Sequence, residues 1–95
     1  MERVKAINAT RKSFQNDLKK LPPNVRKEAI DRIAGLINYP IPHAWRFHRL
    51  SDYKPNIYTI DVWPQKAYKA SFNIVEGVAI MRRIGTHKNI DRSPE

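Results

Sequence analysis

The sequence predicts an α+β fold in which a helical hairpin packs on one face of a twisted, mostly antiparallel sheet of four to five strands. Three observations predict it. Apolar residues recur at helical spacing in the first half of the chain and alternate with polar residues in the second half. Prolines stand where elements should end, at Pro22, Pro23, Pro40 and Pro42. The 95 residues are enough for one core and too few for two, so we expect residues 1–95 to form one domain.

In the first half we expect a short strand and two helices. Val4 to Ala9 is weakly patterned and is the expected first strand. Thr10 is suited to cap a helix with one apolar stripe, formed by Phe14, Leu18 and Leu21. Pro23 and Asn24 are suited to open the second helix, whose apolar face holds Val25, Ala29, Ile33 and Leu36. Residues 38–43 then form a linker.

In the second half a period of two predicts four strands joined by short turns. The first covers Trp45 to Leu50, and the second alternates apolar and polar residues from Tyr58 to Trp63. The third has one apolar face, formed by Tyr68, Ala70, Phe72 and Ile74. The fourth follows a turn at Glu76 and Gly77, and its apolar run from Val78 to Met81 predicts a strand buried on both sides.

We expect the helices to leave the other face of the sheet open and polar. It would be lined by His48, Thr59, Asp61 and Lys69, with the cationic stretch after Met81 at its edge. Gly85 is the expected bend that directs His87 back across the sheet, because glycine takes backbone angles that other residues avoid.

The composition predicts a polyanionic partner. The chain has 18 Lys and Arg against 9 Asp and Glu, a net charge of +9 that favours nucleic acid. A basic protein that is merely soluble, or that binds an acidic protein, is the alternative. The sequence has no cysteine, which excludes disulfides and thiolate chemistry, and no apolar run of membrane-spanning length. We therefore expect a soluble cytoplasmic protein without a membrane partner.

The sequence lacks a glycine-rich phosphate loop, a G-x-S-x-G motif and a His-Glu-x-x-His motif. We expect no cofactor and no metal. What remains is a cluster of histidines and cations, which suits metal-independent RNA cleavage. That reaction needs a base for the 2′-hydroxyl, an acid for the leaving 5′-oxygen and cations for the phosphate. The candidate catalytic residues are His87, Lys69, His48 and Asp61.

Further basic residues and one aromatic residue are expected to bind the RNA: Arg46, Arg49, Lys66, Arg82, Arg83, Lys88 and Trp63. Simpler roles stay open for several candidates. His48 could be a solvated surface residue, and Lys69 could pair with Asp61. Arg82 and Arg83 could contact acidic groups of a partner instead of phosphate.

Five short motifs carry a family resemblance through their order along the chain, from Val4 to Asp91: L-P-P, F-H-R-L, I-Y-T-I-D-V, A-Y-K-A-S-F and M-R-R-I-G-T-H. The sequence resembles the RelE/ParE superfamily of toxins from type II toxin-antitoxin pairs. The resemblance implies a small toxin that a cognate antitoxin neutralises. In the ribonuclease branch such toxins cut mRNA in the ribosomal A site and stop translation and growth, and they meet DNA only through the antitoxin complex.

By position, the closing I-G-T-H resembles YafQ-like members and implies that His87 is a general acid or base. Lys69 takes the position that is commonly an arginine binding the scissile phosphate. His48 lies where several relatives have a basic residue or histidine, and Asp61 and Thr59 lie where RelE has lysines and YafQ-like members a carboxylate and a histidine. Three features depart from the family pattern: Lys69 in place of the usual arginine, the non-titratable Thr59, and the lack of a long terminal helix. A ParE-like toxin that inhibits DNA gyrase, or an inactive member that only binds its antitoxin, is the alternative.

Overall fold

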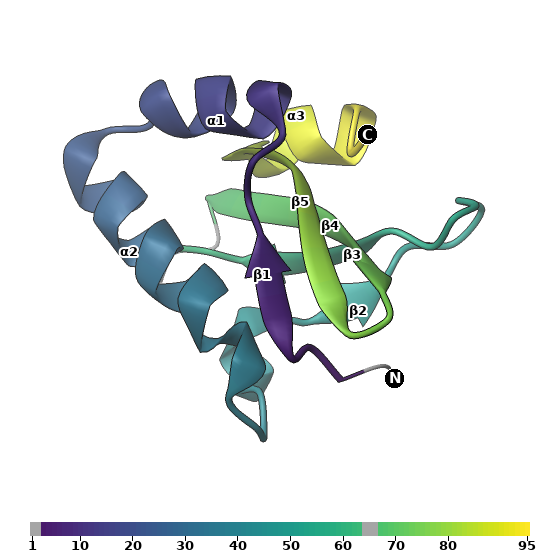
Figure 1. Cartoon of the computed structure of the whole chain (residues 1–95). Helices are drawn as coiled ribbons and strands as arrows, with labels where there is room; N and C mark the ends of the chain where they lie inside the picture. The colour runs from purple at the N-terminus through teal and green to yellow at the C-terminus, as the bar shows by residue number, and fades with distance from the viewer. Residues whose placement is uncertain (1–2, 64–66) are drawn as a thin grey trace.

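A computed structural model describes residues 3–63 and 67–95, and it contains one five-stranded sheet with helices packed against it (Figure 1). The elements follow one another as β1 (Ala6–Asn8), α1 (Lys12–Lys19), α2 (Pro23–Ala34), β2 (His48–Arg49), β3 (Tyr58–Asp61), β4 (Tyr68–Val75), β5 (Val78–Thr86) and α3 (His87–Arg92). Two short 3₁₀ turns, Gly35–Ile37 and His43–Trp45, lie between α2 and β2. The predicted α+β class and the predicted order of elements are confirmed, and α3 is an addition.

The strands lie in the order β1-β5-β4-β3-β2. Only β1 is parallel to its neighbour, β5, and the other pairs are antiparallel. The predicted turn at Glu76 and Gly77 joins β4 to β5 with both residues at positive φ, 51° and 80°. Two-residue hairpin turns of this hand match the twist of the strands they join, so the turn sets the register of the two longest strands.

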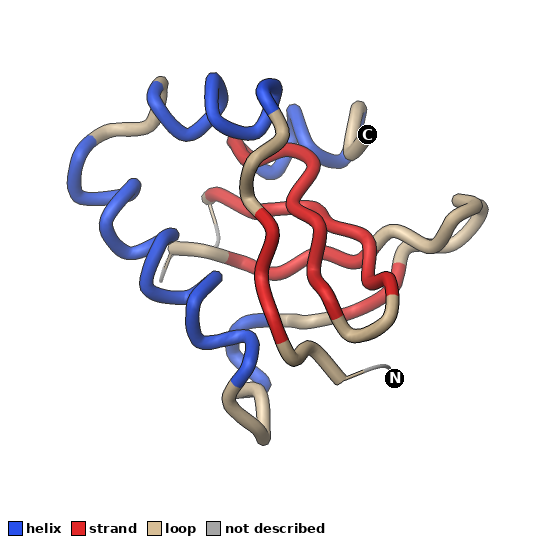
Figure 2. The backbone as a smooth tube through the Cα atoms, in the orientation of Figure 1, coloured by secondary structure: helices blue, strands red, loops and turns tan. Residues whose placement is uncertain are grey.

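The core lies between the sheet and the pair of helices α1 and α2, which flank the strands at the top and left of Figure 2. The predicted helical stripes face it, and so does the predicted apolar face of β4. Phe14, Leu36, Ile60, Phe72 and Met81 are all fully buried there. Amphipathic periodicity therefore identified the core side of these elements correctly.

Helix α1 also covers an edge of the sheet. β1 pairs only with residues 78–80 of β5, which leaves the later part of β5 without a strand neighbour on that side. There the Asp17 carboxylate of α1 accepts a hydrogen bond from the backbone N–H of Ile84 at 3.2 Å. It also accepts hydrogen bonds from Arg83, at 2.6 Å from Nε and 3.2 Å from Nη2. A side chain thus satisfies a strand edge that would otherwise be open to another chain.

Three local predictions were wrong. Helix α1 begins at Lys12 after Arg11, and Thr10 instead donates to the Asn8 side chain at 2.7 Å. The strand predicted over Trp45 to Leu50 is reduced to His48–Arg49, because Arg46 has a φ of 52° and cannot continue a strand. β5 continues through Gly85 to Thr86 without a bend, and its irregularity is a register shift opposite Ser71 and Phe72.

The second face of the sheet is polar, as predicted, but it is not open. Thr59, Asp61 and Ser71 expose 2% of their surface or less. Helix α3 packs on β4 and β5, and the chain after it continues over this face. Ser71 donates to the backbone carbonyl of Pro94, and Arg82 donates to that of Glu95 at 3.3 Å. The polar strand residues therefore form a buried layer under the end of the chain.

No helix in residues 3–63 and 67–95 is both long and apolar enough to cross a bilayer.

Candidate functional site

The site is built around a carboxylate and an imidazole from two different elements. Asp61 is the last residue of β3, and His87 is the first residue of α3. The Nε2 atom of His87 lies 2.8 Å from Oδ1 of Asp61. Only 2% of the Asp61 side chain is exposed, against 29% for His87. A buried carboxylate thus holds a histidine that reaches the surface.

The start of α3 is held in place by two backbone contacts. The backbone N–H of His87 donates to the carbonyl of Ala67 at 3.0 Å. The Thr86 hydroxyl accepts a hydrogen bond from the N–H of Asn89 at 3.3 Å, which caps the helix. The cap and the contact with Ala67, which directly precedes β4, together hold the imidazole next to the end of β3.

The contact with Asp61 determines which nitrogen of His87 faces the solvent. An ionised carboxylate can only accept hydrogen bonds, so Nε2 carries the proton that is shared with Asp61. Nδ1 has no hydrogen-bond partner among the described residues. A neutral histidine held in this way presents a free Nδ1 lone pair, which can take a proton from a substrate and later return it.

The second carboxylate oxygen of Asp61 is incompletely satisfied. Oδ2 is buried and has no hydrogen bond in the described part of the chain, and its nearest cation is Nε of Arg46 at 4.0 Å. The backbone carbonyl of Asp61 accepts a hydrogen bond from Arg32 at 2.9 Å. The buried carboxylate therefore lies between His87 and Arg46.

Lys69 lies beside the pair but is bonded elsewhere. It is the direct antiparallel neighbour of Asp61, yet its ammonium group lies 2.8 Å from Oδ1 of Asp91 on α3. Its side chain is only 9% exposed, whereas that of Asp91 is 58% exposed. The pairing of Lys69 with Asp61 that the sequence left open is replaced by a pairing with Asp91.

His48 lies on β2, directly across from Thr59 of β3. Its Nδ1 atom is 2.7 Å from the carbonyl oxygen of Arg46, and its Nε2 atom is 3.5 Å from the Thr59 hydroxyl. The carbonyl can only accept, so Nδ1 carries a proton and Nε2 is the nitrogen that can exchange one. The structure therefore brings His48, Asp61, Lys69 and His87 to the same face of the sheet.

The structure places the predicted RNA-binding residues in different surroundings. Arg46, Arg49 and Lys88 are exposed cations on the segments that carry the site. Arg82 is held by Asn73 at 2.9 Å, and burial, followed by the nearby Arg11 charge, lowers its pKa. Arg83 is not brought to the site, because it bonds Asp17 of α1, and this hydrogen bond raises its pKa. Trp63 packs half-buried against the core, and Lys66 lies outside the described residues.

Sequence reasoning missed Asp91 and the helix that carries it. The signal was present, because Thr86 is a good N-cap residue and Ile90 supplies the apolar contact of a short helix. In residues 3–63 and 67–95 no three His, Cys, Asp or Glu side chains converge as metal ligands would. The chemistry that this arrangement can support is proton transfer beside fixed cations.

No family model and no curated protein matches this sequence significantly. Several solved structures match this chain. RelE in the RelB-RelE antitoxin-toxin complex from Methanococcus jannaschii is 24% identical, with a TM-score of 0.62 over 86% of this chain and 93% of that chain. YafQ from E. coli is 18% identical, with a TM-score of 0.62 over 95% of this chain and 98% of that chain. In the E. coli DinJ-YafQ toxin-antitoxin complex the match has 18% identity and a TM-score of 0.63, over 94% of this chain and 98% of that chain. The chain therefore has the fold of the RelE and YafQ toxins.

Proposed function

We propose that this protein is the toxin of a type II toxin-antitoxin pair and that it cleaves mRNA without a metal ion. The observation that carries the proposal is the hydrogen bond between Asp61 and His87, in a protein with a net charge of +9. It leaves Nδ1 of the partly exposed imidazole without a partner in residues 3–63 and 67–95. The shared fold with RelE and YafQ supports the toxin role.

In the proposed reaction Nδ1 of His87 removes the proton of a ribose 2′-hydroxyl. The resulting oxygen attacks the adjacent phosphorus, the bond to the 5′-oxygen breaks, and the products carry a 2′,3′-cyclic phosphate and a 5′-hydroxyl. Asp61 stabilises the imidazolium that forms, as the carboxylate of a catalytic triad does. His48 is the second histidine on this face, and in its protonated form it would give the proton on Nε2 to the leaving oxygen.

Cations near the pair would hold the phosphate as its negative charge grows. Arg46 is exposed and lies beside Asp61, so it can reach a bound phosphate without rearrangement. Lys69 can do so only after it leaves Asp91. Fixed cations of this kind are among the largest contributions to phosphoryl-transfer catalysis.

We propose a cognate antitoxin, mRNA and the ribosomal A site as partners, in the cytoplasm. The solved structures of the RelB-RelE and DinJ-YafQ complexes support an antitoxin as partner, and the excess of positive charge supports an acidic one.

The test is induced expression of the wild type and His87→Ala in a bacterium, with growth measured and mRNA 5′ ends mapped by primer extension. We expect the wild type to arrest growth and create discrete new ends, and His87→Ala to do neither. Asn89→Ala is the matched control, because this exposed residue lies on the same helix and its side chain has no contact with Asp61 among the described residues.

Growth arrest without new ends, or equal toxicity of His87→Ala, would contradict a nuclease that uses this histidine. DNA damage signalling in that case would indicate gyrase inhibition instead. If cut positions follow the reading frame, cleavage depends on the ribosome.

A further inference from the structure

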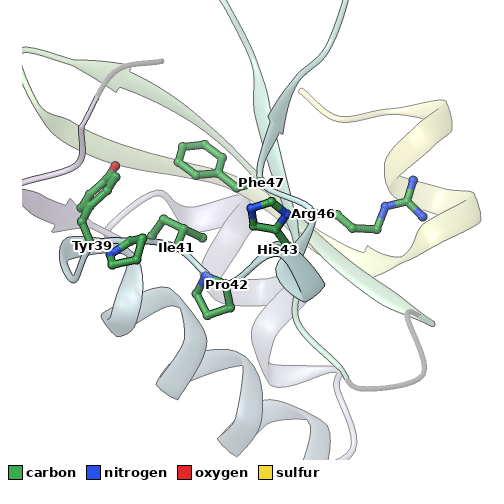
Figure 3. Close-up of a pocket in the computed structure, with 7 residues that line it drawn as sticks. Tyr39, Ile41, Pro42, His43, Arg46 and Phe47 are labelled. Atoms are coloured by element: carbon green, nitrogen blue, oxygen red, sulfur yellow. The ribbon is translucent and has the colours of Figure 1, made fainter.

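The strongest unassigned feature is a pocket formed by the segment between α2 and β2, and one of its lining residues, Arg46, also lies 4.0 Å from Asp61. We call it the loop pocket. Its volume is about 350 Å³, within the range of small-ligand sites. It is lined by Tyr39, Pro40, Ile41, Pro42, His43, Arg46 and Phe47 (Figure 3).

We infer that the loop pocket binds a nucleobase of the RNA next to the scissile phosphate, and so determines base preference. This inference rests on the proposed function and adds a base-binding subsite to it. Its argument has three parts: the shape and chemistry of the lining, the rigidity of the segment, and the connection to Asp61 and His87.

The lining suits a flat heterocycle. Phe47 is held by its neighbours, with ring centroids 5.8 Å from Tyr58 and 5.7 Å from Phe72. Ile41 and two prolines supply apolar walls, whereas the exposed His43 imidazole and the Arg46 guanidinium supply polar groups. Single-stranded RNA is recognised in this way, by stacking on rings and by hydrogen bonds to base edges.

The segment is held in one conformation by the 3₁₀ turn His43–Trp45. The N–H of Trp45 donates to Pro42 at 3.1 Å, and that of Arg46 donates to His43 at 3.0 Å. The Trp45 ring rests against Gly35, where a Cβ would lie only 2.8 Å from it. Arg32 lies over the same ring at 5.6 Å. The pocket is therefore formed before any ligand binds, which lowers the cost of binding.

Arg46 connects the pocket to the candidate catalytic pair. It has a φ of 52°, a conformation that is unfavourable for a residue other than glycine and that is concentrated at functional sites. Its side chain extends from the pocket toward α3 (Figure 3). Its Nε atom lies 4.0 Å from Asp61, whose other oxygen is 2.8 Å from His87. A nucleotide with its base in the pocket would place its phosphate beside Arg46 and the imidazole.

Nucleotide binding by the full-length protein tests the inference directly. Backbone amide NMR shifts are followed while AMP, GMP, CMP or UMP is added, with ribose 5-phosphate as the control without a base. We expect at least one nucleotide to shift the amides of Ile41, His43 and Phe47 at concentrations where ribose 5-phosphate does not. His87→Ala should shift the same three amides, because they lie in the loop pocket and report the base, while loss of the imidazole beside the phosphate should weaken binding. Equal shifts with ribose 5-phosphate would overturn the inference.

Two variants make the test specific. Ile41→Trp should fill the pocket, and His43→Ala should remove a ring from its mouth. Each should weaken nucleotide binding by about tenfold, the value expected for one lost stacking contact. Ile37→Trp is the matched control, because Ile37 is exposed and lies outside the lining. His43 is exposed, so His43→Ala should fold even if Ile41→Trp does not.

Mapping of cleavage sites separates this inference from the proposed function. If Ile41→Trp and His43→Ala cut the same transcript at the same bases and rates as the wild type, the base subsite is wrong and the nuclease stands. If the wild type cuts no RNA while His87→Ala still binds nucleotides in the loop pocket, the nuclease fails and the binding site stands. An altered base preference in the two pocket variants supports the nuclease as well as the base subsite.

Discussion

Asp61 shows how much of the site depends on a single buried charge. The carboxylate is 2% exposed and one of its oxygens holds His87. Among residues 3–63 and 67–95 the other oxygen has no hydrogen bond, and Arg46 lies 4.0 Å from it. Burial of a charge without full pairing destabilises a protein, and such groups persist where function requires them. The carboxylate that holds the proposed base is thus also a buried group with one unpaired oxygen among the described residues.

Asp61→Asn should abolish most RNA cleavage while the protein remains folded. An amide keeps the shape but cannot stabilise an imidazolium, and it can hold the wrong histidine tautomer. We expect a loss of about 10²- to 10⁴-fold in rate, by analogy with other histidine-carboxylate pairs. The measurement is the cleavage rate of a defined RNA by purified protein, with circular dichroism to confirm folding. Asp31→Asn, at an exposed site on α2, is the control, and full activity of Asp61→Asn would rule out this role.

At the scale of elements, α1 and α3 each complete the sheet with an acidic side chain. Asp17 of α1 satisfies the β5 edge, and Asp91 of α3 neutralises a buried lysine. Both helices thus stabilise β5 and β4 by local charge as well as by apolar contact.

Asp17→Ala should lower the free energy of unfolding by about 1–3 kcal/mol, because it leaves a strand N–H and a guanidinium without their acceptor. Chemical denaturation at neutral pH measures this loss, and Asp31→Ala, at an exposed site on α2, is the control. A change within error of that control would show that water replaces the carboxylate at the edge.

The stability that the charge of Arg83 contributes through its contact with Asp17 should not vary with pH near neutrality. The hydrogen bond to Asp17 raises the pKa of Arg83 in the folded state. The stabilisation by Arg83 is therefore complete below the pKa that this residue has in the unfolded chain. It is lost only as pH rises through the folded value, beyond the range of ordinary experiments. Denaturation midpoints of Arg83→Lys and wild type should therefore stay at a constant separation between about pH 7 and pH 9, where lysine is also charged. A separation that changes with pH in this window would show that another group titrates with the contact.

Asp91→Asn should tighten RNA binding, because it frees the ammonium group of Lys69 for phosphate. The exposed carboxylate now takes the place that a phosphate oxygen would take, and RNA must displace it. We expect about a three- to tenfold gain in affinity for a 2′-deoxy-substituted RNA that cannot be cleaved, measured by fluorescence anisotropy. Asp52→Asn controls for the change in net charge, at an exposed loop residue. An equal gain in both variants would show a general charge effect rather than release of Lys69.

At the scale of the whole molecule, the excess of positive charge determines how the protein meets RNA. Nine net charges on a chain of 95 residues are spread over both halves of the sequence. Such a surface attracts single strands before any specific contact forms.

RNA binding should therefore weaken steeply with salt. With about four phosphates neutralised, the slope of log affinity against log salt would be about −3, a loss of about 50-fold between roughly 50 and 200 mM. Anisotropy titrations over this range measure the slope, and Lys12→Ala, on the exposed side of α1, provides a cation outside the site for comparison. An affinity independent of salt would contradict phosphate binding as the main contribution.

Local periodicity in the sequence was sufficient for the class of fold, the helical hairpin and the faces of β3 and β4, because burial of an apolar stripe is decided within one element. Residue chemistry and the family resemblance made His87 and Asp61 candidates, but neither predicted the hydrogen bond between them. The partner of Lys69, the cover over the polar face and the left-handed turn at Arg46 came only from the tertiary structure. The Lys69–Asp91 and Asp61–His87 contacts join residues that are 22 and 26 positions apart. Their geometry depends on how whole elements pack, so no local pattern in the sequence encodes it.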